Sequence, residues 1–353
     1  MKINKLRIEN LRNLVDVSVK PHQDLNFIVG DNGAGKTAIL ESMVVLSRGR
    51  SFRTPQASEL IGPEKKSFRV FAEILNDDGK SHRLGLERTG KQWKARKDAS
   101  DLEKISELTH SLPIILMEPN SHLVVSGTPE FRRKFLDWGV FHVEHSFLET
   151  WKRFSRVLKQ RNSALRTGQN DILDSLDSQI SPLGERLSDL RTKHKESINE
   201  ELKELLPALS PELKGIELEY LNGWGSGRYE DALKEGRERD MDRGATHSGP
   251  HRADMTILKG KALARTMLSR GEQKIVSAAL LLAQSKLLTS LGESPIILLD
   301  DLASEFDKVH FDNVLKEARQ RGGQVWITGT NMPEPNGKHK MFHVKHGILK
   351  EML

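Results

Sequence analysis

The chain contains no cysteine, few aromatic residues and no long apolar segment. Cysteine is absent from all 353 residues, which excludes disulfides and thiolate metal sites. No apolar run approaches the roughly 20 residues that a membrane-spanning helix needs. The opening residues 1–4 lack the apolar core of a signal peptide. We therefore expect a cytoplasmic protein with no membrane partner.

Basic residues outnumber acidic ones in this chain. It has 55 Lys and Arg against 49 Asp and Glu, a net charge of +6 and a pI near 9.3. This balance points weakly toward a polyanionic partner such as nucleic acid. The length is sufficient for one large domain or two smaller ones with a sizeable core.

A glycine-rich stretch is the strongest functional signal. Residues 26–29 predict a buried strand and a helical pattern begins at Ala38. Between them the phosphate-binding pattern G-x-x-x-x-G-K-[ST] is matched at every fixed position, by Gly30, Asp31, Asn32, Gly33, Ala34, Gly35, Lys36 and Thr37. Glycines let backbone N–H groups reach phosphate oxygens, and the helix N-terminus favours an anion. We expect Lys36 to bridge the β- and γ-phosphates and Thr37 to ligate Mg²⁺. The sequence predicts a nucleoside triphosphate site.

A second motif supplies acidic residues for this site. The apolar residues 295–299 predict a buried strand that ends in Asp300 and Asp301. Asp300 is placed to hold Mg²⁺ directly or through water, and Asp301 to polarise the attacking water as general base. The alternative is a strand that merely ends in a polar turn. The presence of a phosphate loop in the same chain makes this alternative less favoured. About 260 residues separate Lys36 from Asp300, so a large segment is inserted between the two motifs.

The order of motifs near Asp300 resembles the ABC-type ATPases. The first segment in this order is 268–274, which contains Ser269 and Gly271. An apolar helical pattern follows, then the strand that ends in two aspartates, and then residues 303–307. This series is similar to the signature, Walker B and D-loop motifs of that superfamily. The resemblance implies that Ser269 and Gly271 bind the γ-phosphate of an ATP molecule held by a second protomer, so that ATP binding drives homodimerisation. A helix N-terminus at Ser269 is a suitable anion site.

Further segments resemble the SMC-like branch and, within it, the RecF family. Residues 6–13 end in Arg12 and Asn13, a pair that approaches the nucleotide in that branch. Three segments carry the RecF resemblance: 49–54, 131–139 and 248–254. The match runs from the first strand to the closing residues 341–347 and covers essentially the whole chain. It implies binding to gapped, double-stranded and single-stranded DNA at the nucleoid. It also implies action with RecR and RecO in helping RecA onto gaps, in recombinational repair and replication restart.

Two departures from the ABC pattern predict slow hydrolysis of ATP. Residues 112–119 lack the Gln expected to sense Mg²⁺ and water, and residues 325–330 offer no switch His. Asp301 is also shorter than the Glu common at its position. Three alternatives stay open: a transporter ATPase subunit, an ATP-gated nuclease, and a scaffold that binds ATP without hydrolysing it.

The predicted fold class is α/β, with a P-loop ATPase head of ABC/SMC type, mixed sheets and an inserted helical arm. Head residues are 1–118 and 213–353, and the arm is 119–212. Apolar residues at helical spacing predict two antiparallel arm helices, over 147–165 and over 180–206 with its end before Pro207. In the head, residues 69–75 and 81–87 flank a turn and predict a hairpin.

Basic residues on the arm are candidates for DNA contact. The first arm helix carries Lys152, Arg153, Arg156, Lys159, Arg161 and Arg166, and residues 152, 156, 159 and 166 share one face. Arg132 and Arg133 form a second candidate. A solvated basic face is the alternative in both cases. Neither patch has interleaved aromatics, so we expect backbone contact over base readout. Near His247 and His251 we expect a structural turn, because no Cys or obvious carboxylate supports a metal site.

Overall fold

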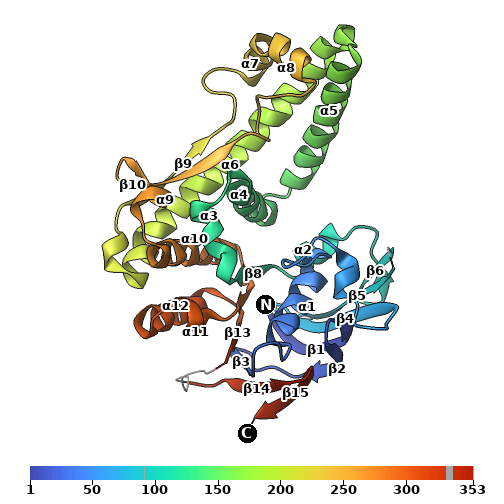
Figure 1. The fold of residues 1–353 in the computed structure, drawn as a ribbon, viewed down its shortest axis with the longest axis vertical. Helices are drawn as coiled ribbons and strands as arrows, with labels where there is room; N and C mark the ends of the chain where they lie inside the picture. The colour runs from blue at the N-terminus through green and yellow to red at the C-terminus, as the bar shows by residue number, and fades with distance from the viewer. Residues whose placement is uncertain (91, 331–336, 353) are drawn as a thin grey trace. The chain divides into compact units, whose positions relative to one another are not determined.

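The computed structural model describes residues 1–90, 92–330 and 337–352, and the chain divides into two compact units (Figure 1). The head unit consists of Met1–Ser121 and Ala278–Leu353, and the arm unit of His122–Ser277. Each unit has a hydrophobic cluster of its own.

One sheet of the head unit is antiparallel and is built from the first hundred residues. Its strand order is β2-β1-β4-β5-β6-β7. The hairpin predicted around residues 76–80 is confirmed, because β4 and β5 pair antiparallel from Leu75 opposite Ser81 to Ser67 opposite Thr89. Buried residues alternate along β4 with residues that are partly or fully exposed, as expected for a sheet with one covered face. The strands are β1 Lys2–Leu11, β2 Leu14–Val19, β4 Ser67–Leu75, β5 Ser81–Thr89, β6 Gln92–Lys97 and β7 Ser100–Asp101.

The other head sheet is mostly parallel and joins both ends of the chain. Its order is β15-β14-β3-β13-β12-β8, and only β15 runs antiparallel to its neighbour. β3, β12 and β13 are buried throughout, which is typical of parallel strands covered on both faces. The strands are β3 Leu25–Val29, β8 Ile114–Met117, β12 Ile296–Leu299, β13 Gln324–Gly329, β14 Lys340–Lys345 and β15 Ile348–Met352.

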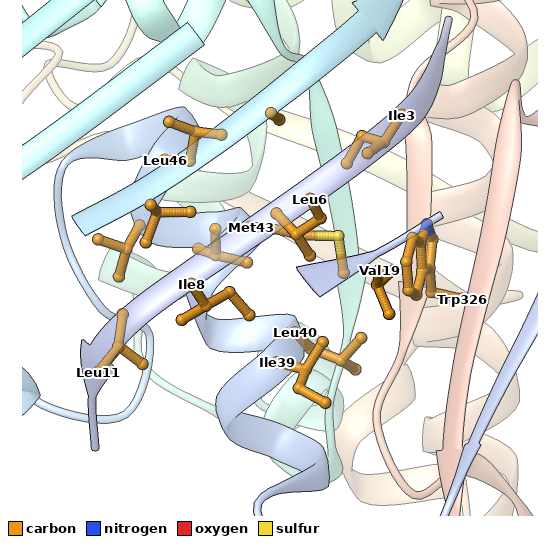
Figure 2. Packing of buried hydrophobic residues seen from close by; sticks show 14 of the residues in the cluster. Ile3, Leu6, Ile8, Leu11, Val19, Ile39, Leu40, Met43, Leu46 and Trp326 are labelled. Carbon is orange, nitrogen blue, oxygen red and sulfur yellow. The ribbon is translucent and has the colours of Figure 1, made fainter. Parts of the chain in front are cut away.

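Helix α1 (Lys36–Arg48) packs in the hydrophobic core of the head unit. Its residues from Ala38 to Ser47 are all buried. Figure 2 shows Ile39, Leu40 and Met43 of α1 close to Leu6 and Ile8 of β1. Burying each such side chain contributes about 1.5–3 kcal/mol. This packing holds the start of α1, and hence the glycine-rich loop, against the sheets. The other head helices are η1 Ala57–Leu60, α2 Ser106–Ser111, α11 Leu302–Glu305 and α12 Lys308–Arg321.

Two long helices form the main part of the arm unit. α5 covers Phe147–Thr167 and α6 covers Leu173–Leu209, and α5 packs against part of the longer α6 (Figure 1). The predicted end of the second helix before Pro207 is wrong. The last turn persists because Leu205, Leu206 and Leu209 are buried and hold it in place despite the hydrogen bond that proline removes.

Shorter elements complete the arm unit. A small antiparallel sheet has the order β11-β10-β9, and β9 packs against α6. This packing explains why residues 213–277 group with the arm helices, whereas the predicted boundary fell at residue 212. The elements are α3 Leu123–Ser126, α4 Pro129–Val143, η3 Asn170–Ile172, η4 Pro211–Leu213, β9 Ile216–Leu221, α7 Tyr229–Glu235, α8 Arg237–Arg243, β10 Asp254–Lys259, β11 Ala262–Leu263 and α9 Ala264–Met267. Two further elements contain residues of both units: η2 Pro119–His122 and α10 Arg270–Ser290.

Candidate nucleotide-binding site

The glycine-rich loop connects the buried strand β3 to helix α1. Gly30 and Gly35 have φ angles of +157° and +117°, values that residues with a Cβ rarely adopt. A Cβ at Gly30 would lie 2.3 Å from the carbonyl oxygen of Val344, so only glycine fits there. Asn13 supports the loop from the turn between β1 and β2, since its Nδ2 donates to the carbonyl oxygen of Ala34 at 3.2 Å. The loop thus has the wrapped conformation that suits a phosphate.

Lys36 folds back over the loop. Its Nζ donates hydrogen bonds to the carbonyl oxygens of Gly30 at 2.7 Å and Asp31 at 3.0 Å. The side chain is buried, and an ammonium group removed from water needs such partners. Its positive charge therefore lies within the loop, where a phosphate would be bound.

Thr37 and Asp300 meet although 263 positions separate them. Thr37 Oγ1 donates to Asp300 Oδ1 at 2.9 Å. Thr328 Oγ1, at the end of β13, donates to the same oxygen at 2.7 Å. β3, β13 and β12 are neighbours in the parallel sheet, so their carboxyl ends lie side by side. Hydroxyl and carboxylate oxygens are ligands that Mg²⁺ takes alongside substrate phosphates, so these two residues fit the ion.

The two aspartates after β12 have different surroundings. Burial raises the pKa of Asp300 above its ordinary value, and hydrogen bonds from Thr328 and Thr37 partly offset this. Asp301 has a left-handed backbone with φ of +52°. Its N–H donates to Thr328 Oγ1 at 2.9 Å, and its Oδ2 accepts from Ser304 Oγ at 2.8 Å. These bonds orient the Asp301 carboxylate, as a general base requires.

Glu118 is a third carboxylate that sequence reasoning did not single out. It follows β8, which pairs with β12, and Asp300 N–H donates to the carbonyl oxygen of Met117 at 2.8 Å. Burial, followed by the negative charge of Asp300, raises the pKa of Glu118 to about 7, while Arg48 and Arg53 oppose the rise. It lies in the segment where a Gln was expected. A carboxylate directly after an apolar strand was the signal available.

Arg12 is held by a buried carboxylate on α1. Its Nε and Nη2 donate to the two oxygens of Glu41, both at 2.9 Å. Glu41 is fully buried, accepts a hydrogen bond from Ser51 Oγ, and lies 3.6 Å from Arg53 Nη1. One acid therefore connects the end of β1, helix α1 and the following loop. Sequence reasoning missed Glu41; an acid at a core position of a helical pattern was its only signal.

Several of these groups line one cavity of about 540 Å³, a size typical of small-molecule sites. Eight of its lining residues were predicted from sequence: Arg12, Asn13, Asn32, Gly33, Gly35, Lys36, Thr37 and Asp301. Six further lining residues were not predicted as site residues: Ala38, Arg53, Glu59, Ile61, Pro63 and Thr328.

The predicted signature residues belong to the arm unit. Ser269 precedes α10, its N–H donates to Glu272 Oε2 at 2.8 Å, and its Oγ accepts from the Glu272 N–H at 3.3 Å. This reciprocal pair is a capping box, which fixes the start of the helix. A Cβ at Gly271 would have no heavy atom within 4 Å. Backbone at this helix start is therefore open around Gly271.

Five of the predicted basic residues on α5 are exposed: Lys152, Arg153, Arg156, Lys159 and Arg166. Arg161 requires a correction. It is completely buried, and its guanidinium pairs with Asp177 at 2.6 Å and Asp240 at 2.8 Å. With its charge neutralised inside the arm unit, Arg161 is unavailable to DNA.

The candidate at the start of α4 requires the same correction. Arg132 is buried and forms a forked pair with Asp254, at 2.7 and 2.9 Å. Arg133 is half-buried and donates to the carbonyl oxygen of Ala253 at 2.7 Å. Both side chains fasten α4 to the start of β10. The helical spacing of this patch concealed its partners, because they come from another part of the chain.

The histidine-containing turn has structural partners. His247 Nδ1 lies 3.1 Å from Asp240 Oδ1, and His251 Nε2 lies 3.0 Å from the carbonyl oxygen of Thr246. Within residues 1–90, 92–330 and 337–352, no three His, Cys, Asp or Glu side chains cluster as a metal site. No helix in those ranges has the length and apolar character to cross a membrane.

Comparisons with known proteins agree with this geometry. The family described as RecF/RecN/SMC N terminal domain matches residues 2–348. A solved structure of the recombination mediator protein RecF with ATP superposes with a TM-score of 0.90 over 100% of this chain and 98% of that one, at 24% identity. An SMC head bound to the C-terminal winged-helix domain of ScpA gives a TM-score of 0.60 over 100% and 97%, at 16% identity. The fold is therefore the P-loop ATPase head of the ABC/SMC class, as predicted.

Curated relatives narrow the class further. The DNA replication and repair protein RecF of Xanthomonas euvesicatoria pv. vesicatoria (strain 85-10) is 39% identical, over 98% of both chains. RecF of Stenotrophomonas maltophilia (strain R551-3) is 38% identical over 98% of both, and RecF of Marinomonas sp. (strain MWYL1) is 35% identical over 93% of this chain and 90% of its own. The chain belongs to the RecF family.

Proposed function

We propose that this protein is an ATP-switched DNA-binding protein of recombinational gap repair and replication restart. The observation that carries the proposal is the hydrogen bond from Thr37 to Asp300, because it joins a phosphate loop to an acidic strand end beside one cavity. The relatives' names as DNA replication and repair proteins support the biological setting. The ATP-bound RecF structure with the same fold supports the nucleotide.

The residues around the cavity have separate roles in this proposal. The loop from Gly30 to Thr37 encloses the phosphates, with Lys36 on the β- and γ-phosphates. Thr37 and Asp300 hold Mg²⁺, which when bound neutralises phosphate charge. Asp301 orients and deprotonates the attacking water. Without a Gln or switch His in the expected segments, we propose slow hydrolysis, so ATP acts mainly as a conformational switch.

Dimerisation completes the proposed site. Ser269 and Gly271 of one protomer contact the γ-phosphate bound by its partner, at the open helix start described above. Arg12 and Asn13 stand beside the same nucleotide. Loss of the γ-phosphate removes these contacts and opens the dimer.

DNA is the proposed macromolecular ligand, contacted through the exposed basic residues of α5. Action with RecR and RecO on RecA at gaps, in the cytoplasm at the nucleoid, is proposed from family membership. A transporter subunit is disfavoured because the RecF relatives match nearly the whole chain. An ATP-gated nuclease is disfavoured for the same reason.

A DNA-binding titration tests the proposal. Gapped duplex is titrated with protein in the presence of ATP, ADP or no nucleotide, at two salt concentrations. We expect ATP to tighten binding and salt to weaken it steeply, since the contacts are to phosphates. Lys36→Ala is the matched control, and we expect it to lose the ATP effect.

Three results would contradict parts of the proposal. Binding that ignores nucleotide would separate ATP from DNA contact. Normal ATP turnover by Lys36→Ala would refute the phosphate-loop role of Lys36. Metal-dependent cleavage of the DNA would favour the nuclease.

A further inference from the structure

A groove of about 660 Å³ lies between helices α5 and α6 of the arm unit, on residues that the nucleotide chemistry does not use. Figure 1 shows the two helices side by side. Arg153, Arg156 and Gln160 line the groove from α5, and Gln179 and Arg186 line it from α6. Its lining includes no carboxylate.

The helix register brings arginines from both helices to one level. The Arg161–Asp177 ion pair fixes which residues of α5 and α6 stand opposite each other. Arg153 precedes Arg161 on α5, and Arg186 follows Asp177 on α6, by about 12 and 13 Å of helix rise respectively. Because the helices are antiparallel, Arg153 and Arg186 face the groove from opposite sides at the same height.

These groove arginines differ from the buried arginines of the same unit. Arg132 and Arg161 each pair with carboxylates. Arg153, Arg156 and Arg186 are exposed and form no ion pair within the part of the chain that the structure describes. Three like charges around one concave surface repel each other, so an anion placed among them is stabilised.

The positive charge continues along α5 beyond the groove. Lys152, Lys159 and Arg166 are exposed, and Lys152 to Arg166 spans about 21 Å of helix. The segment from Trp151 to Asn170 contains no Asp or Glu. A linear series of cations matches a linear polyanion better than a single small anion.

We propose that this groove is a phosphate-binding site for the nucleic-acid backbone, in which Arg153 and Arg156 of α5 act together with Arg186 of α6. Gln160 and Gln179 supply amide donors at the end of the same groove. The proposal rests on the proposed DNA-binding function and extends it to α6, which sequence reasoning did not include. An acidic peptide is the other polyanion, but its charges are carried on flexible side chains, whereas a nucleic-acid strand carries one charge at every residue along its backbone.

The test measures salt dependence of DNA binding by fluorescence anisotropy. Full-length protein with ATP is titrated into labelled gapped duplex at several salt concentrations between about 50 and 200 mM. Replacing Arg153, Arg156 and Arg186 together by Gln should make the slope of log K against log salt shallower by about 3, since each phosphate contact contributes about 0.9. Arg186→Gln alone should reduce it by about 1, and Arg186→Lys should restore it.

Lys214→Gln is the control, because Lys214 is an exposed cation elsewhere in the arm unit. It should leave the slope unchanged, and the triple variant should keep the ATP affinity and thermal midpoint of the wild type. An unchanged slope in the triple variant would overturn the proposal that the groove binds the nucleic-acid backbone. This outcome includes the case in which the groove binds an acidic peptide instead. If wild-type protein bound no DNA in any nucleotide state, the proposed function itself would fail. If the wild type binds DNA and the triple variant binds it with the same salt dependence, only the proposal about the groove fails.

Discussion

Three carboxylates end neighbouring strands of the parallel sheet, and each has a different electrostatic setting. Asp300 is buried and hydrogen bonded to two threonines, and Asp301 lines the cavity. Burial raises the pKa of Glu118, and no hydrogen bond to its side chain is among the effects that oppose this rise. The ionised form of Glu118 is therefore unfavourable in the folded protein.

We expect Glu118→Gln to stabilise the nucleotide-free protein at alkaline pH. The folded protein holds the Glu118 proton up to about pH 7, while the unfolded chain releases it near its ordinary value of 4.5. Folding stability contributed by this group therefore falls as pH rises from 4.5 to 7, and stays low above. Allowing for partial exposure, the variant should gain about 1–2 kcal/mol at alkaline pH and little near pH 4.5.

Urea unfolding at both pH values measures this difference in the free energy of unfolding. Glu103→Gln, at an exposed acid of the same unit, is the control and should change little at either pH. An equal gain by Glu118→Gln at both pH values would show that charge is not the cause.

At the scale of residues, the residues of the phosphate loop were predictable from sequence, but the surrounding residues that hold the site in place were not. Gly30 to Thr37 are specified by local chemistry, since phosphate binding needs those residue types at fixed spacing. Glu41, Glu118 and Arg53 are defined by which strands and loops lie next to α1 and β12. A single sequence does not contain that pairing, so the weak local signals at Glu41 and Glu118 were not enough to assign these residues to the site.

Helix α6 contains a glycine whose replacement should reverse the usual helix preference. Alanine is about 1 kcal/mol better than glycine inside a helix. At Gly184, however, an added Cβ would lie 2.6 Å from ring atoms of Tyr229. Tyr229 is fully buried, so the ring cannot move without loss of packing. We expect Gly184→Ala to destabilise the arm unit by about 1–3 kcal/mol.

Hydrogen exchange of α6 amides measures this loss locally. In a Tyr229→Ala background the obstruction is gone, and the same substitution should become neutral or stabilising. A destabilisation that persists there would mean that the clash with Tyr229 is not its origin.

The buried ion pairs of Arg161 should contribute more to the stability of the arm unit than the exposed cations of the same helix do. Arg161 also donates to Thr246 Oγ1 at 2.8 Å, in addition to Asp177 and Asp240. Arg161→Met would remove the guanidinium shared by two buried carboxylates, and breaking a buried pair in this way costs about 3–5 kcal/mol. Arg166→Met, on the same helix but exposed, should cost less than about 0.5 kcal/mol. Chemical denaturation followed by exchange protection of α5 compares the two; equal effects would contradict the buried-network account.

At the scale of elements, the spacing of apolar residues predicted the two long helices, but it did not predict all their ends or the residues that contact them. The apolar spacing predicted α5 and α6 within a few residues at most ends. The largest difference is at the start of α6, which begins at Leu173 and not at residue 180 as predicted. At the other end the helix passes Pro207, because packing of Leu206 and Leu209 outweighs the local cost of proline. Arg161 lies off the face shared by residues 152, 156, 159 and 166, and that offset was the available sign that it points elsewhere.

For the whole molecule, the proposed composite site predicts a selective defect. Ser269→Arg places a long cation at the open helix start before Gly271. Because this surface would meet the partner's nucleotide, ATP-dependent dimerisation should weaken by at least about tenfold, or 1.4 kcal/mol. ATP binding by the monomer should be unchanged, since the P-loop lies in the other compact unit.

Light scattering after size exclusion, with ATP and with ADP, measures the dimer. Ser290→Arg is the matched control, at an exposed serine near the other end of α10. A Ser269→Arg protein that dimerises normally with ATP would refute the sandwich. The motif order predicted the class and the large insertion, but not that residues 213–277 group with the arm helices, because the contact between β9 and α6 has no local signature.

The position of β3 in its sheet also has a consequence during synthesis. β3 is made early, yet its two neighbours are β13 and β14, from the far end of the chain. The antiparallel sheet, by contrast, uses only residues 2–101 and can form at once. A ribosome adding about 5–20 residues per second needs roughly 15–60 s to travel from β3 to β13. During that interval the phosphate loop has no finished sheet behind it and no Asp300 beside it. A nascent chain therefore cannot take up nucleotide until its last parallel strands emerge.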